Sequence, residues 1–362
     1  MKFPRLKPES DAMLHFDLLR FIAALAIVFH HSHGFFYSAT DRKILNEQTH
    51  GLGLFVDLFF LISGYVISYT YHQRVNNFPK VFKFFQRRIG RLVPLHWAML
   101  AISTMTVAVA SHFGPMATPP DISTSCIIKT TLLLQAIYPC SGSPPNPVSW
   151  SISTEMLLYI LFPIIIALAN KYKNVFLSIS TFLVIYTIIY AYNLSVRDWT
   201  DSYAPIRALP SFMFGMSLFI MRDKLPSFFA ASKLMWISLI LLIFSMILGF
   251  SSGILLMLTY FIGLSGVMAD KIKSPQLVHK LSGLGQLTYS IYMIHYIVII
   301  VLINAISDKI LKLNGFYMFI SIFLSYGIIL MLSYISYFYF ENPLRRWVDG
   351  LNLSYFDSRL KR

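Results

Sequence analysis

The stretch Asp17-LLRFIAALAIVFHHSH-Gly34 decides how the rest of the sequence is interpreted. It is apolar and long enough to cross a bilayer as a helix, yet it carries Arg20 near its start and His30 and His31 near its end. Such groups are costly inside a span, so each is a candidate for function. Arg20 and His31 are eleven residues apart, so they share a helix face at about 16 Å separation, with His30 rotated about 100° away. We therefore expect Arg20 and His31 to face one cavity.

The composition is that of an integral membrane protein. The chain has 362 residues, of which 56% are hydrophobic and 13% charged, whereas soluble domains are about 25% charged. Its apolar runs, roughly 17–25 residues long, match the thickness of a bilayer core. No cleavable signal peptide follows the polar, basic residues 1–16, so the first run is expected to be retained. These features predict an all-α, polytopic membrane bundle, with residues 1–362 forming a single domain.

The topology follows from the apolar runs and the basic residues between them. We expect about ten transmembrane helices, at residues 16–37, 51–71, 91–111, 150–169, 174–193, 205–221, 233–250, 252–268, 286–306 and 315–340. With the N-terminus inside, 23 of the 30 Lys and Arg residues fall on the inner side and 7 on the outer side. Basic residues concentrate in cytoplasmic loops, so the sequence predicts an N-in, C-in arrangement. The net charge of +14 is explained in this way without nucleic acid as a partner.

The long outer loop, residues 112–149, contains both cysteines of the chain. An oxidising compartment would allow Cys126 and Cys140 to form a disulfide, and the alternative is two unpaired thiols. Neither their number nor their spacing suggests a metal site. The apolar segment Ser123–Tyr138 is too short to span, so it lies at the interface or re-enters the membrane from outside.

The predicted topology sorts the polar residues by depth. On the inner side lie Arg20, Arg87, Arg88 and Arg91; on the outer half lie His31, Asp57, Glu155 and Arg207; and Tyr292 and His295 lie near the middle of the ninth span. This arrangement predicts a basic inner mouth and an outer chamber that contains a histidine and a glutamate.

The inner residues are suited to binding an anion. Arg88 and Arg91 are three residues apart and share a helix face, where two guanidinium groups can hold phosphates. The alternative is that they are ordinary cytoplasmic charges, which we prefer for Arg87.

The outer residues are suited to proton chemistry. Imidazole titrates near neutrality, and Glu155 lies in the first turns of its helix, where the dipole favours a carboxylate. A histidine and a glutamate at matching depth indicate an enzyme or a proton relay. Ser63-Gly64 is typical of close helix packing or of room for a ligand. Glu341 is interpreted as a structural anchor.

Seven segments together resemble one known family, the acyltransferase-3 family of integral-membrane acyltransferases. They are Asp17-LLR with ten residues before His31, GLGLFVDLFFLISGYVIS at 51–68, RRIGRLVP at 87–94, VSWSISTEMLLYILFP at 148–163, RALPSFMFG at 207–215, LGQLTYSIYMIH at 284–295 and YFYFENP at 337–343. The resemblance covers most of the chain. It implies that Arg20 and His31 are the family's Arg-x10-His pair, that Glu155 is its Trp-Ser-x-Ser-x-Glu carboxylate, and that Arg88 and Arg91 belong to the motif associated with acyl-CoA.

The family resemblance implies an enzyme of the bacterial cytoplasmic (inner) membrane. Its members move an acyl group, usually acetyl from acetyl-CoA, to a hydroxyl of a carbohydrate such as a polysaccharide or a lipid-linked sugar, and no metal is expected. His31 would be a general base or a transient acyl carrier, and Glu155 would orient it or hold the acceptor. Arg20 would bind a phosphate of coenzyme A or fix Asp17.

The remaining candidate residues are expected to bind substrate. Asp57, Ser63, Arg207, Tyr292 and His295 are the predicted substrate-binding residues, and Ser63, Tyr292 or backbone amides would supply the oxyanion donor.

The alternative function is that of a transporter or flippase of a lipid-linked sugar or small solute, although the paired broken helices of transporters are not visible in the sequence. A structural scaffold would leave the His, Glu and Arg residues unexplained.

Overall fold

The computed structural model describes residues 6, 13–35, 50–112, 119–193, 203–226, 232–272 and 274–351. Its α-helices are α1 (Leu14–Ser32), α3 (Phe55–Tyr71), α4 (Phe78–His112), α5 (Thr124–Thr131), α6 (Trp150–Lys171), α7 (Lys173–Asn193), α8 (Ala204–Met221), α9 (Ser232–Ile247), α10 (Ser252–Ala269), α11 (Gln276–Ser282), α12 (Thr288–Val298), α13 (Gly315–Ser336) and α14 (Asn342–Gly350). Short 3-10 segments are η2 (His33–Phe35), η3 (His50–Leu54), η4 (Pro147–Ser149) and η6 (Gly283–Leu287), and π-helical segments are η7 (Ile299–Ile310) and η8 (Tyr337–Glu341). The predicted all-α class is confirmed.

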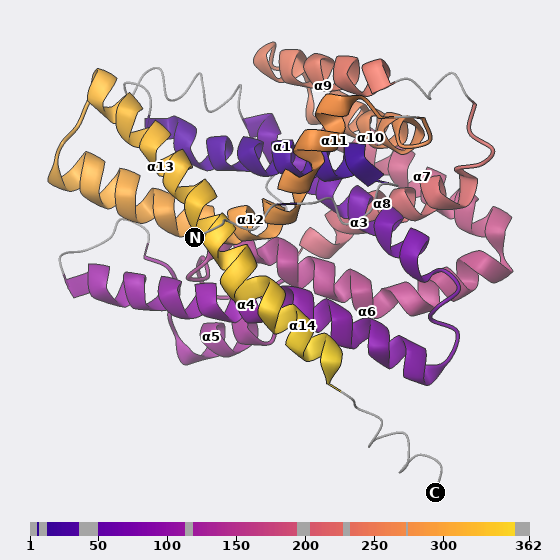
Figure 1. Ribbon diagram of the computed structural model, residues 1–362, viewed down its shortest axis with the longest axis horizontal. Helices are drawn as coiled ribbons and strands as arrows, with labels where there is room; N and C mark the ends of the chain where they lie inside the picture. Colours follow the sequence, from indigo (N-terminus) through magenta and orange to yellow (C-terminus); the bar gives the residue numbers. More distant parts are fainter. Residues whose placement is uncertain are drawn as a thin grey trace, which may run out of the picture.

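The helices form a multi-pass membrane bundle (Figure 1). In the described part of the chain, nine helical segments are long and apolar enough to cross a membrane, and the shorter apolar helix α9 lies where the seventh of the ten predicted spans was expected. α7 and α13 expose large apolar side chains such as Phe182, at 65%, and Phe323, at 59%. Such faces are unfavourable in water and suit contact with lipid. The basic tails used to predict the orientation lie outside the described residues, so N-in, C-in stays a prediction.

α4 extends further toward the N-terminus than the third predicted span, residues 91–111, which it contains. The helix begins at Phe78 and takes in most of the basic segment that was expected to be an inner loop. The Asn77 side chain accepts a hydrogen bond from the Lys80 backbone N–H (3.1 Å), a contact typical of helix N-termini. Lys, Arg and Gln are good helix formers, so charge alone does not end a helix here. The result is that Arg88 and Arg91 project from a rigid helix.

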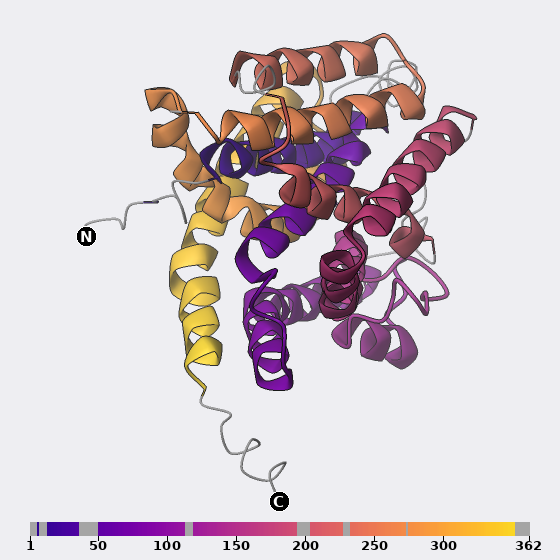
Figure 2. The ribbon, with the colours of Figure 1, turned by 90° about the vertical axis from the view of Figure 1, so that its right-hand side faces the viewer.

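The end of the chain packs back against α4. α13, η8 and α14 run diagonally across the face of the bundle shown in Figure 1, and Figure 2 shows the yellow C-terminal helix beside the purple α4. Gly90 allows this approach, because a Cβ there would lie 2.9 Å from Val348 Cβ. Gln86 and Lys83 of α4 donate hydrogen bonds to the last carbonyls of α14, at Val348 and Asp349. α4 therefore caps α14.

The described part of the predicted outer loop, residues 119–149, folds onto the bundle through α5. His96 Nε2 lies 2.8 Å from Thr130 O, and Trp97 Nε1 donates to Thr131 O (2.9 Å). His96 is near the middle of α4, so the loop reaches into the bundle, which favours the re-entrant alternative. Cys126 and Cys140 form the predicted disulfide.

Candidate functional site: an arginine-lined pocket and a histidine cluster

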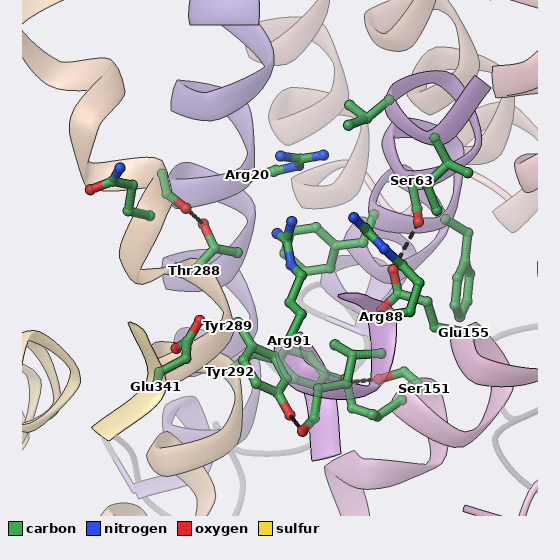
Figure 3. Close-up of a pocket in the computed structure, with 18 of the residues that line it drawn as sticks. Arg20, Ser63, Arg88, Arg91, Ser151, Glu155, Thr288, Tyr289, Tyr292 and Glu341 are labelled. Atoms are coloured by element: carbon green, nitrogen blue, oxygen red, sulfur yellow. Dashed lines mark hydrogen bonds between the residues drawn. The ribbon is translucent and has the colours of Figure 1, made fainter. Parts of the chain in front are cut away.

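One pocket collects polar residues from five of the helices that belong to candidate spans, α1, α3, α4, α6 and α12, and from the C-terminal helix α14. Its volume is about 110 Å³. The predicted site residues that line it are Arg20 of α1, Ser63 of α3, Arg88 and Arg91 of α4, Glu155 of α6 and Tyr292 of α12. These six residues, separated by up to 272 positions in the chain, thus face one space (Figure 3).

Three guanidinium groups point into this pocket. Figure 3 shows those of Arg20, Arg88 and Arg91 turned toward the same space. Arg20 Nη1 lies 3.4 Å from Asp17 Oδ1, one turn away, so the predicted Asp17 partner is present. Arg88 lies over aromatic rings, with its guanidinium carbon 5.4 Å from the Tyr71 ring centre and 5.7 Å from that of Tyr159. Such stacking holds the guanidinium plane in place for an anion.

Glu155 is held by two hydroxyl groups. Ser63 Oγ donates a hydrogen bond to Glu155 Oε1 (2.8 Å), and the Tyr159 hydroxyl, one turn along α6, donates to the same oxygen. Ser63 Oγ and Tyr159 OH are 3.2 Å apart, so the three groups form a closed triangle. Glu155 is therefore a fixed carboxylate among arginines, and not the partner of His31 in a separate outer chamber, as the depth assignment suggested.

His31 lies in a histidine cluster next to the pocket. Its ring centre is 5.2 Å from that of His295, 5.0 Å from that of His30 and 5.7 Å from that of Tyr296. His31 and His295 are not among the residues that line the pocket. The expectation that Arg20 and His31 face one cavity is thus wrong for this pocket, since almost three helical turns separate the two residues.

Tyr292 connects the pocket to the histidine cluster. It lines the pocket, and its ring centre is 5.8 Å from that of His295, one turn further along α12. Its hydroxyl donates to Val148 O (3.1 Å) and accepts from Ser151 Oγ (2.8 Å), which joins α12 to the start of α6. Tyr292 is thereby fixed at the boundary between the two groups of residues.

Asp57 and Arg207 are paired with each other. Arg207 Nη2 lies 2.7 Å and Nε 3.1 Å from Asp57 Oδ2, both side chains are 2% exposed, and Nη2 also donates to Gly53 O (2.9 Å). Neither residue lines the pocket. The pair joins α3 to α8, and the predicted role of both residues in substrate binding stays a prediction.

Several pocket residues were not predicted as site residues. Glu341, expected to be only an anchor, lines the pocket and accepts a hydrogen bond from Ser290 Oγ (2.7 Å). Tyr159 and Arg345 also line it. Tyr159 lies four residues from Glu155, and Arg345 lies four residues from Glu341. This spacing puts two side chains on one helix face, and it was the signal that could have added Tyr159 and Arg345 to the site.

The described residues offer one grouping of three groups with metal-ligand chemistry. It consists of Asp121, Cys126 and Cys140. The two cysteines form a disulfide and supply no thiolate. This grouping is therefore not interpreted as a metal centre.

Comparison with known proteins decides the family. The Acyltransferase domain family, acyltransferase 3, matches residues 14–338 of this chain. The chain belongs to this family. It is similar to Nodulation protein 10 of Rhizobium leguminosarum bv. viciae, with 21% identity over 83% of this chain and 86% of that protein. It is also similar to Acyltransferase MdmB of Streptomyces mycarofaciens, with 29% identity over 42% of this chain and 39% of that protein. No solved structure matches it.

Family membership and the spanning helices together define the protein as a multi-pass membrane acyltransferase. The predicted family is therefore confirmed.

Proposed function

We propose that this protein transfers an acetyl group from acetyl-CoA to a hydroxyl of a cell-surface polysaccharide or lipid-linked sugar, in the cytoplasmic membrane of a bacterium. The convergence of Arg20, Arg88 and Arg91 on one pocket carries the proposal. The pocket holds four arginines, counting Arg345, against the three carboxylates Asp17, Glu155 and Glu341. This balance favours an anionic ligand, and phosphate groups of an acyl-CoA suit guanidinium groups in particular.

The donor would enter with its phosphates against the arginines and its thioester toward Tyr292. A nucleotide is too large for a pocket of about 110 Å³, since pockets that hold drug-sized ligands measure roughly 300–1,000 Å³. The nucleotide would therefore stay at the mouth near Arg345, while the narrow pantetheine arm enters the pocket. Glu155, held by Ser63 and Tyr159, would fix the arm or the acceptor.

Transfer itself requires a base for the acceptor hydroxyl. In the proposed step His31 takes the hydroxyl proton, the hydroxyl oxygen bonds to the acyl carbon, and the carbon–sulfur bond breaks. The leaving thiolate takes the proton back and departs as the free thiol. A variant in which His31 carries the acyl group between two such steps gives the same products. Membership of an acyltransferase family makes the transporter alternative unnecessary.

The first test follows labelled acetyl from acetyl-CoA into the polysaccharide fraction of membranes. Base-labile label with the wild type, lost in His31→Ala at equal protein level, is the expected result. His112→Ala is the matched control, because His112 lies exposed at the far end of α4. Absence of label with the wild type and every acyl-CoA tried would refute the proposed reaction. Undiminished label in His31→Ala would refute only the role of His31.

A second test addresses the donor site. Arg88→Gln should raise the KM for acetyl-CoA by about 10-fold or more, since a charge-assisted contact contributes about 1.5–3 kcal/mol. Its neighbour Arg87 is exposed and does not line the pocket, so Arg87→Gln is a control of equal charge. Equal effects of the two substitutions would count against a donor site at Arg88.

A further inference from the structure

His295 carries a buried nitrogen that the fold leaves without a hydrogen-bond partner. The residue is 0% exposed, and its Nδ1 lies 3.1 Å from the carbonyl oxygen of Ile291, one turn earlier in α12. A neutral imidazole that donates from Nδ1 has a bare lone pair on Nε2. Among the described residues, Nε2 is buried and has no partner. A buried acceptor without a partner has lost its hydrogen bonds to water and gained none in return, so it calls for an explanation.

His31 lies beside His295, and a neutral imidazole always has one ring N–H to donate. The ring centre of His31 is 5.2 Å from the His295 ring and the planes are tilted by 35°. When one nitrogen of each ring points along the line between the ring centres, a separation of 5.2 Å brings these two nitrogens to about 3 Å, an ordinary hydrogen-bond length. The two residues come from α1 and α12, which pack directly against each other. Both rings therefore sit on rigid, neighbouring elements.

We propose that His295 is a positioning residue that accepts a hydrogen bond from His31 and thereby sets its tautomer. The inference rests on the proposed function and adds a partner to its general base. A proton held between His31 and His295 Nε2 leaves the second nitrogen of His31 as a lone pair for the acceptor hydroxyl. This is the task that the carboxylate performs for the histidine of a serine protease, carried out here by a neutral ring.

The proton balance of the step is unchanged by His295. The hydroxyl proton goes to the free nitrogen of His31, which becomes an imidazolium. The lone pair of His295 then faces a cation and stabilises it, because hydrogen bonds to a charged donor are roughly twice as strong as neutral ones. The same proton returns to the departing thiolate. His295 neither gains nor loses a proton overall.

The other neighbours of His31 are less suited to this task. His30 precedes it in the chain and projects from a different helix face. The Tyr296 ring meets His31 nearly edge-on, at 88°. Only His295, among these three, combines a fixed Nδ1 donor with an unassigned acceptor.

The decisive experiment compares His295→Gln with His295→Leu. Glutamine keeps a carbonyl acceptor near the place of Nε2, whereas leucine fills the space without one. If His295 sets the tautomer, His295→Leu should lower kcat by about 100-fold or more, while His295→Gln stays within about 10-fold of the wild type. The KM for acetyl-CoA should change less than about 2-fold, because His295 does not line the donor pocket. A residue that serves only packing would give the opposite order, since a buried amide is worse tolerated than leucine.

His96 provides the matched control. It is also 0% exposed and also has one buried ring nitrogen, Nδ1, without a partner among the described residues, but it lies on α4, outside the histidine cluster, and its Nε2 lies 2.8 Å from Thr130 O. His96→Gln should leave kcat within about 2-fold, because the glutamine amide can replace that bond.

A second readout does not depend on activity. Solid-state NMR of protein labelled with ¹⁵N-histidine reports which ring nitrogen carries the proton, and His31→Gln identifies the His31 signals. In His295→Leu those signals should shift toward a mixture of tautomers. Unchanged His31 signals, or full kcat in His295→Leu, would overturn the inference. If the wild type transfers no acyl group, the NMR result still decides whether the pair exists, so failure of the proposed function is distinguishable.

Discussion

The buried pair between Asp57 and Arg207 provides the sharpest test of how the bundle is held together. Asp57→Asn removes the carboxylate charge and leaves the guanidinium, which is 2% exposed, without its counter-ion. Breaking one side of such a pair costs about 3–5 kcal/mol, because the remaining charge stays desolvated. Arg207→Met should cost a similar amount, since it also abandons the hydrogen bond to Gly53 O.

The double replacement should recover most of this loss. Asp57→Leu combined with Arg207→Met puts two apolar side chains where two charges were, and such swaps are often neutral or stabilising. The cycle consists of the wild type, the single variants Asp57→Leu and Arg207→Met, and the double variant. Their free energies of unfolding, measured by titrating purified protein in micelles with sodium dodecyl sulfate, should show a coupling above about 3 kcal/mol. Single changes below about 1 kcal/mol, or a double mutant equal to the sum of the singles, would refute the reasoning.

The same variants separate a structural role from substrate binding. A pair that only joins α3 to α8 gives a stable double mutant with wild-type KM values. If these residues bind the acceptor, as the sequence suggested, the double mutant will be folded yet show a raised KM for the acceptor. Label transfer at varied acceptor concentration measures this difference.

Two further predictions concern packing and pH. Gly215→Ala should destabilise the protein by about 1–3 kcal/mol in the same unfolding assay. The reason is that the added Cβ would lie 2.8 Å from the backbone nitrogen of Tyr65 in α3. Gly327→Ala is the control, because a Cβ at that position meets nothing within 4 Å. Hydrogen bonds from Ser123, first its side chain and then its backbone N–H, hold the pKa of Asp121 below its ordinary 3.8. The stabilisation is therefore full above that value and is lost as pH falls below it. At about pH 5 a phosphine should reduce the nearby disulfide more slowly in the wild type than in Asp121→Asn, and this ratio of rates should shrink at about pH 3.

The sequence predicted the spans well because hydropathy alone decides them. Each predicted range overlaps one helical segment, and the disulfide followed from two cysteines in one outer loop. The start of α4 was missed because a run of basic residues looks like a loop while being compatible with a helix. Local composition cannot separate these two cases.

The grouping of the site residues was harder to predict. Counting along a span gives the depth of Glu155, but not whether its side chain turns toward Ser63 or toward His31. The direction of a side chain depends on helix rotation and on contacts between distant segments. One such contact joins Asp57 to Arg207, which are 150 residues apart in the chain. Arg20, Arg88 and Arg91 were predicted to be together, because the family motif and the inner side agreed.

α12 is the element that unites the two halves of the site. Tyr292 faces the arginine pocket and His295 faces His31, and the two residues are three positions apart on adjoining faces of one helix. A donor whose phosphates bind the arginines on the predicted cytoplasmic side and an acceptor that enters from the opposite side would thus meet at Tyr292. Because the Tyr292 hydroxyl is tied to Ser151 and Val148 at the start of α6, a shift of α12 would move the pocket wall and the histidine partner together. The helix thereby holds one wall of the arginine pocket and the neighbour of His31 in a fixed relation to each other.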